Sequence, residues 1–101
     1  MTTGIADTRS LANLIQPAKL KAHGFPKPAR VSVIFGTDHT GEESYQVFLV
    51  FSDKTPDATL AWSNVKGMVR WVRDQIRQAD GERRWPYVRV KRESDFASTS
   101  S

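Results

Sequence analysis

The sequence predicts an α+β domain in which one long helix packs on a small, mainly antiparallel three-stranded sheet, with short helices near the N-terminus. Two observations predict it. The segments 29–35, 44–52 and 85–92 have the apolar patterns of β-strands. Between 58 and 79 the apolar residues fall within an arc of about 100°, which is typical of an amphipathic helix. The order helix, strand, strand, helix, strand therefore indicates a two-layer sandwich.

The N-terminal part predicts two short helices after a polar, flexible start over residues 1–9. Leu11 and Ile15 lie four residues apart and give the first helix an apolar face. Pro17 opens the second helix, because the amide proton that proline lacks would have no partner in a first turn. Gly24 ends this helix, since glycine readily adopts the positive φ of a helix stop.

The two central segments predict a β-hairpin. Segment 29–35 alternates apolar and polar residues, as a strand with one buried face does. Segment 44–52 is apolar on both faces, which is typical of a central strand. The eight residues between them, 36–43, form a loop that is short enough to join antiparallel neighbours.

The long helix and the last strand complete the two layers. The start of the helix is ambiguous, because both a Thr-Pro pair at position 55 and Ser63 can begin a helix, whereas Gly81 marks its end. In the last strand Pro86 favours an edge position, where a missing N–H costs least. Residues 93–101 are polar, show no periodicity and are expected to be disordered.

Length and composition limit the function classes. A chain of 101 residues fits one domain, here 10–92. It contains no cysteine, which excludes disulfides, thiolate metal ligands and cysteine nucleophiles. The longest apolar run, Val47 to Phe51, is far too short to cross a bilayer, and the first residues lack the pattern of a signal peptide. We therefore expect a cytoplasmic protein that needs no cofactor and has no membrane partner.

The excess of positive charge lies in one part of the chain. Residues 1–65 carry six Lys and Arg against six Asp and Glu, whereas residues 66–92 carry nine against three, a balance of +6. Residues 93–101 contribute −2, which gives the total of +4. A local excess of this size attracts phosphate backbones and acidic proteins.

Four of these cations recur at helical spacing and predict a basic stripe about 60° wide beside the apolar arc. The sequence therefore favours a non-enzymatic binding module that engages the nucleic-acid backbone, with an acidic protein as the other possible partner. The alternative interpretation is a solvated helix face, because Lys and Arg are good helix formers. The stripe comprises Lys66, Arg70, Arg73 and Arg77. Residues expected to extend the same surface are Arg83, Arg84, Arg89 and Lys91.

A protein-interaction or self-assembling module, in the simplest case a homodimer, is the alternative function. With one long helix on three strands, the second face of the sheet has no predicted cover. A sheet that is apolar on both sides gains by pairing with a copy of itself. The residues expected at this interface are Ile34, Phe48, Val50 and Tyr87.

Three tryptophans, Trp62, Trp71 and Trp85, lie within 24 residues. Trp71 falls on the far side of the long helix from the basic stripe. We expect it to pack against the N-terminal segment rather than to contact a partner, since a small core uses every large side chain it has.

The loop between the first two strands holds Asp38, His39 and Glu42, which can bind metals or, as an Asp-His pair, act as a general base. The chain has no pair of histidines at metal-binding spacing and no strand-turn-helix serine motif. An enzyme built on this loop is therefore the weakest hypothesis, and we assign no catalytic residue and no metal ligand. Glycines at 36 and 41 indicate an ordinary turn instead.

Overall fold

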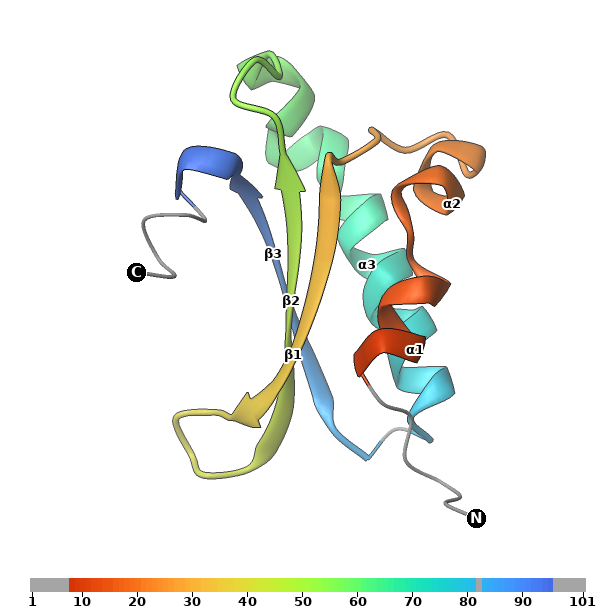
Figure 1. The fold of residues 1–101 in the computed structure, drawn as a ribbon, viewed down its shortest axis with the longest axis vertical. Coiled ribbons are helices and arrows are strands. Elements are labelled where there is room, and N and C mark those ends of the chain that lie inside the picture. The colour runs from red at the N-terminus through yellow and green to blue at the C-terminus, as the bar shows by residue number, and fades with distance from the viewer. Residues whose placement is uncertain (1–7, 82, 96–101) are drawn as a thin grey trace.

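Three strands form one sheet, and the helices lie against it (Figure 1). The computed structural model describes residues 8–81 and 83–95. The predicted α+β class is confirmed, and so is the order helix, strand, strand, helix, strand. The elements are α1 (Thr8–Leu14), α2 (Pro17–Ala22), β1 (Arg30–Thr37), β2 (Glu43–Phe51), the 3-10 helix η1 (Asp57–Leu60), α3 (Trp62–Ala79) and β3 (Trp85–Arg92).

β2 is the central strand, with β1 on one side and β3 on the other. β1 and β2 pair antiparallel, with Val33 opposite Val47. β2 and β3 pair parallel, with Val47 beside Val88, because the chain crosses over through α3 before it returns to the sheet. The sheet is therefore mixed, and the mainly antiparallel arrangement that the sequence predicted describes only one of its two pairings.

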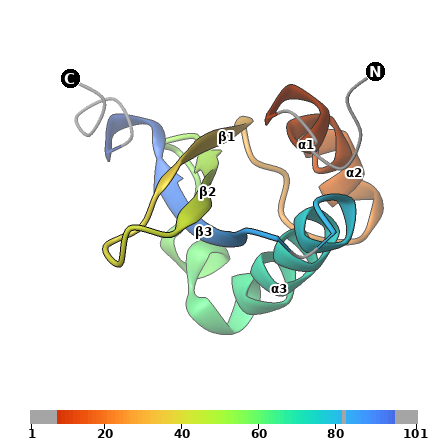
Figure 2. The same ribbon diagram turned by 90° about the horizontal axis from the view of Figure 1, so that it is seen from below.

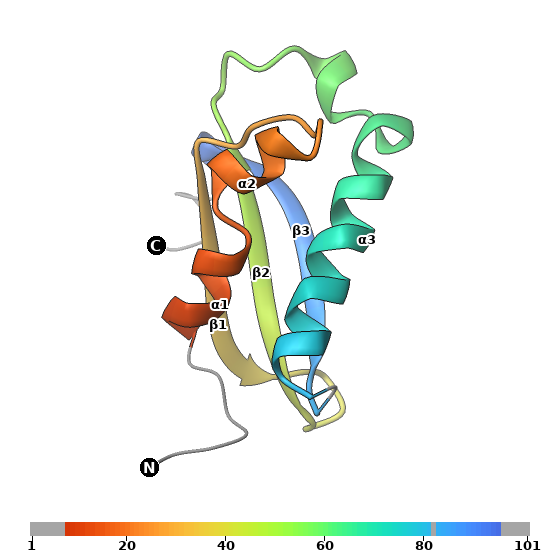
Figure 3. The same ribbon diagram turned by 90° about the vertical axis from the view of Figure 1, so that its right-hand side faces the viewer.

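α1, α2 and α3 all cover the same face of the sheet (Figures 2 and 3). Side chains alternate along each strand, so every second residue points towards these helices. Val47 and Leu49 of β2 are fully buried in this layer, as are Met68 and Val72 of α3. None of the three α-helices lies on the opposite face of the sheet (Figure 2).

The N-terminal helices close one side of the core. α1 starts at Thr8, earlier than predicted, and residues 1–7 of the expected flexible segment lie outside the described residues. α2 begins at Pro17 and is followed by Gly24, whose φ of 82° gives the helix stop that the sequence predicted. The fully buried large side chains of this region are Leu11, Ile15 and Leu20.

α3 begins at Trp62 rather than at either predicted start. The preceding residues form η1, in which the amide of Ala61 donates to the carbonyl of Ala58. Ala61 then takes an extended conformation with a ψ of 141°, which separates η1 from α3. The sequence was therefore wrong to place Ala58 and Ala61 on the apolar arc of the helix. The predicted stop is confirmed by Gly81, which has a φ of 66°.

The chain after β3 forms a short helical turn over residues 93–95. The backbone nitrogen and Oγ of Ser94 donate to Asp53 Oδ1 at 3.1 and 3.0 Å. These three residues of the predicted disordered tail are ordered, whereas residues 96–101 lie outside the described residues. Across the described segments, no helix is both long and apolar enough to cross a membrane.

Candidate nucleic-acid interface

α3 carries the basic stripe along one side. The apolar arc of this 18-residue helix faces the sheet, and the stripe lies next to the arc because each residue advances by about 100°. Lys66 and Arg70 are exposed, whereas Arg73 and Arg77 are half-buried. The structure therefore brings together the four stripe residues that the sequence predicted, on one rigid element.

Trp85 joins this stripe from the first position of β3. The guanidinium carbon of Arg73 lies 5.5 Å from the centroid of the Trp85 ring, and that of Arg77 lies 5.2 Å from it. Both distances are within the range of cation–π attraction, about 6 Å. The indole is nevertheless 44% exposed, because β3 is an edge strand with no neighbour beyond it.

Trp62 belongs to the same stripe, although the sequence reasoning did not place it there. It is the first residue of α3, lies four residues before Lys66 and is 64% exposed. At about 100° per residue, Trp62 projects about 20° from Arg73. The signal was therefore present in the helical spacing, but it becomes clear only once the true start of α3 is known.

The other side of α3 is occupied by the N-terminal segment. The ring of Trp71 lies 4.5 Å from that of His23 and 6.1 Å from that of Phe25, centroid to centroid. Phe25 also lies close to the backbone of α3 at Gly67. A Cβ atom placed on Gly67 would be only 3.7 Å from the Phe25 ring. The prediction that Trp71 packs against the N-terminal segment is confirmed.

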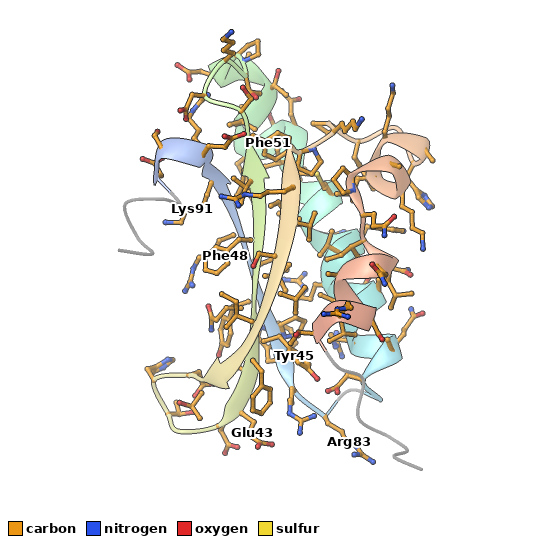
Figure 4. All side chains as sticks on the ribbon, viewed as in Figure 1. Glu43, Tyr45, Phe48, Phe51, Arg83 and Lys91 are labelled. Atoms are coloured by element: carbon orange, nitrogen blue, oxygen red, sulfur yellow. The ribbon has the colours of Figure 1, made fainter. Side chains whose placement is uncertain are left out.

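Arg84 is held inside the protein rather than presented on a basic surface. Its guanidinium lies 3.2 Å from Asp80 Oδ1 and 3.2 Å from Glu43 Oε1, and its side chain is only 10% exposed. The guanidinium carbon also lies 5.1 Å from the centroid of the Phe35 ring. Its neighbour Arg83 is exposed at the same end of the molecule as Glu43 (Figure 4). Of these two predicted contact residues, only Arg83 is open to a partner.

Arg89 and Lys91 lie on the sheet face that points away from the helices. The alternation along β3 sends Val88 and Val90 to the core and these two cations outward, and Figure 4 shows Lys91 on that side. Arg89 Nη1 donates a 2.6 Å hydrogen bond to Gln46 Oε1. The two residues are therefore separated from the stripe by the edge of β3, and they do not form one face with it.

The predicted dimer interface is less open than the sequence suggested. Val50 is fully buried and Phe48 is 9% exposed, although both point away from the helices. In the register of the sheet, Val50 lies between Arg30 and Lys91, and Phe48 lies beside Arg89. The structure therefore leaves little of these two side chains open to a partner.

Exposed apolar surface remains on β1 instead. Ile34, one of the predicted interface residues, is 47% exposed, and Phe35 is 48% exposed. The alternation along β1 places Phe35 on the same face as Val33, which is buried, but at the open edge of the sheet Phe35 stays half-exposed. Tyr87, the remaining predicted interface residue, is half-buried and bonded to the loop after β1.

That loop is organised around the carboxylate of Asp38. Its Oδ1 accepts bonds from the Thr40 hydroxyl at 2.6 Å and from the amides of Thr40 and Glu42 at 2.9 and 3.1 Å, and its Oδ2 accepts from the Tyr87 hydroxyl at 3.0 Å. These bonds, led by that of the Thr40 hydroxyl, lower the pKa of Asp38 from 3.8 to about 2. The ionised carboxylate therefore acts as the hydrogen-bond acceptor that orders this loop.

An open hollow of about 310 Å³ lies beside this loop on the outer face of the sheet. Within residues 8–81 and 83–95, no three His, Asp or Glu side chains come together as a metal site would require. The side chains around the hollow are polar or charged, with both a carboxylate and a guanidinium group among them. They belong to Thr37, Asp38, His39, Gln46, Tyr87 and Arg89.

Comparison with known proteins finds no family model, no curated protein and no solved structure that matches this chain. The candidate interface is therefore defined by geometry and charge alone. It consists of one side of α3 together with the start of β3. Its residues are Trp62, Lys66, Arg70, Arg73, Arg77 and Trp85, and we call this set the α3 surface.

Proposed function

We propose that the protein is a non-enzymatic nucleic-acid-binding module that contacts the phosphate backbone through the α3 surface. The observation that carries the proposal is the alignment of four cations on one side of a single helix, next to an edge strand. Like charges at this spacing repel one another slightly, and a bound polyanion offsets that cost.

The dimensions of the stripe suit a phosphate backbone. Lys66 and Arg77 are separated by eleven residues, which corresponds to about 16 Å along the helix axis. Residues one turn apart are about 5.4 Å apart, so the four cations can follow successive phosphates. If each cation neutralises one phosphate, log K falls with log salt with a slope of about −3 to −4 on duplex DNA. We expect dissociation constants on the order of 10⁻⁴ to 10⁻⁶ M at physiological salt.

Fluorescence anisotropy tests the proposal with a labelled duplex of about 16 base pairs and its single strand, at salt concentrations from about 20 to 200 mM. The double variant Lys66→Glu with Arg70→Glu is expected to lose detectable binding, because both residues are exposed and two attractions become repulsions. Its far-UV circular dichroism should not change, since neither side chain belongs to the core.

The matched control is Lys19→Glu with Lys21→Glu on α2. It makes the same change in net charge at two exposed residues, and the chain that follows α2 packs on the Trp71 side of α3. Binding should be largely retained in this variant. If both double variants lost the same amount of affinity, binding would depend on net charge and not on the α3 surface, which would contradict the proposal. Absence of binding by the original protein at low salt would refute it.

Self-assembly is a second candidate function, and one observation favours it. β1 is an edge strand, and two successive residues on it, Ile34 and Phe35, are half-exposed on opposite faces of the sheet. Edge strands with exposed apolar residues readily pair with another strand. Two copies of β1 related by a twofold axis would pair antiparallel and form a continuous six-stranded sheet.

A further inference from the structure

We infer that the α3 surface is built for single-stranded nucleic acid, with Trp85 and Trp62 as stacking platforms for bases and the four cations as phosphate contacts. This inference rests on the proposed function and names its substrate class. Proteins that bind single strands without sequence preference combine a positive track with aromatic side chains on which bases stack. Both parts are present on this one side of the molecule.

The three tryptophans differ in a way that points to this role. Trp71 packs against the core cluster and contacts His23 and Phe25. Trp62 and Trp85 are not part of that cluster and remain 64% and 44% exposed. A structural role therefore accounts for Trp71, whereas the other two indoles leave a large aromatic area in water beside the cations.

Trp85 is held in place as a stacking platform needs to be. Arg73 and Arg77 come from successive turns of α3, and both guanidinium groups lie within 5.5 Å of its ring centroid. They fix the indole at the edge of β3 and place two positive charges next to it. A base that stacks on the exposed part of the ring therefore has its own phosphates within reach of these two cations.

Trp62 sits at the opposite end of the stripe. Fifteen residues separate it from Arg77, which corresponds to about 22 Å along α3. At a rise of about 3.4 Å per nucleotide, this length holds about six nucleotides of a stacked strand. The stripe thus has an aromatic platform at each end and cations between them. Its length suits a short single strand.

A duplex cannot use these platforms. Its bases are paired and stacked on one another, and separating them costs a few kcal/mol per step. A duplex would therefore contact the cations alone, whereas a single strand gains base stacking in addition. The structure consequently predicts a preference for single strands that depends on Trp62 and Trp85 and does not depend on the salt-sensitive contacts.

The test compares a thymidine oligonucleotide of about eight residues with a hairpin duplex of about 12 base pairs. Trp85→Leu and Trp62→Leu are each expected to weaken single-strand binding by about 5- to 150-fold, the equivalent of one lost stacking contact. The salt slope on the single strand should stay near −3, because all four cations remain. Trp85→Phe, which keeps a ring, should restore most of the affinity.

Trp71→Phe is the matched control, because it changes a tryptophan on the packed side of the same helix. Its affinity for both nucleic acids should equal that of the original protein. The remaining indole fluorescence of this variant comes only from Trp62 and Trp85. We expect it to be quenched by the single strand and not by the hairpin.

The outcomes separate this inference from the function on which it rests. Single-strand binding that is unchanged in both leucine variants would overturn the stacking role while leaving backbone binding intact. No binding to either nucleic acid would overturn both. Equally tight binding of polyglutamate would assign the surface to acidic proteins and would also overturn the inference.

Discussion

The hydroxyl of Tyr45 donates a 2.9 Å hydrogen bond to Asp80 Oδ1 and so connects the central strand to the end of α3. Asp80 is 1% exposed, and its Oδ2 accepts the backbone amide of Arg84 at 2.9 Å. Burial of Tyr45, together with this bond, raises its pKa above the ordinary value of 10.0. The hydroxyl therefore stays protonated and remains a donor to the buried carboxylate at neutral pH.

Replacing Asp80 with alanine should destabilise the protein by about 3 kcal/mol, because it leaves Arg84 nearly buried with only the carboxylate of Glu43 as a partner. Urea unfolding followed by circular dichroism gives this difference. Asp74→Ala is the control, since Asp74 is on the same helix and has no partner in this network, and it should change stability by no more than about 0.5 kcal/mol. Equal effects of the two substitutions would show that the network contributes little.

The stability of the protein should fall on acidification between pH 3.8 and about 2 through Asp38. The pKa of this group is lower in the folded chain than its ordinary value, so its contribution is fully present above 3.8 and is lost as the pH falls towards 2. Unfolding free energies measured across this interval should show a shallower decline in Asp38→Asn. The same decline in both proteins would exclude Asp38 as the cause.

Arg92 should stabilise the loop between β2 and η1. Its Nη1 donates to the carbonyl oxygens of Asp53 and Thr55 at 3.1 and 2.8 Å, and its Nη2 donates to Asp57 Oδ1 at 2.6 Å. Lysine has no planar fork, so Arg92→Lys is expected to cost about 1–2 kcal/mol and to speed proteolysis of the loop.

Asp57→Asn is the comparison for Arg92→Lys. The Asp57 side chain is fully exposed, and exposed ion pairs contribute little, so this variant should lose less than about 0.5 kcal/mol. If it instead lost as much as Arg92→Lys, the ion pair and not the carbonyl contacts would hold the loop.

The second candidate function predicts a dimer at about 50 μM protein in sedimentation velocity, with an interface near the standard 800 Å² per subunit. Ile34→Lys should return it to a monomer without loss of stability, because this side chain is 47% exposed. Phe48→Lys should instead destabilise each subunit, since Phe48 is almost fully covered. A monomer for the unchanged protein would remove this candidate.

Local patterns were sufficient for the identity of the elements. The apolar residues on both faces of 44–52 predicted a central strand, and β2 is central. Pro86 predicted an edge strand, and β3 is one. The start of α3 was predicted less well, because the extended conformation of Ala61 is a property of the chain that the apolar spacing does not reveal.

The residues of the α3 surface could likewise be predicted from the sequence only in part. The common side of Lys66 and Arg70 follows from helical spacing alone, so the sequence predicted it. The exclusion of Arg84 from any basic surface could not be predicted, because its partner Glu43 comes from a strand forty-one residues away and meets it only in the folded chain. Likewise, the spacing of residues along the sequence does not indicate that Trp85 of β3 lies against Arg73 and Arg77 of α3.

By itself, the sequence determined the order of the strands and helices, the alternation of core-facing residues within them, and where the positive charge accumulates. These properties depend on periods of two or 3.6 residues and therefore on near neighbours. Only the tertiary structure decided that β3 runs parallel to β2 and that Val50 is covered while Phe35 is not. The direction of a strand follows from its crossover, and the exposure of a side chain follows from its neighbours on adjacent strands, which the order of residues does not specify.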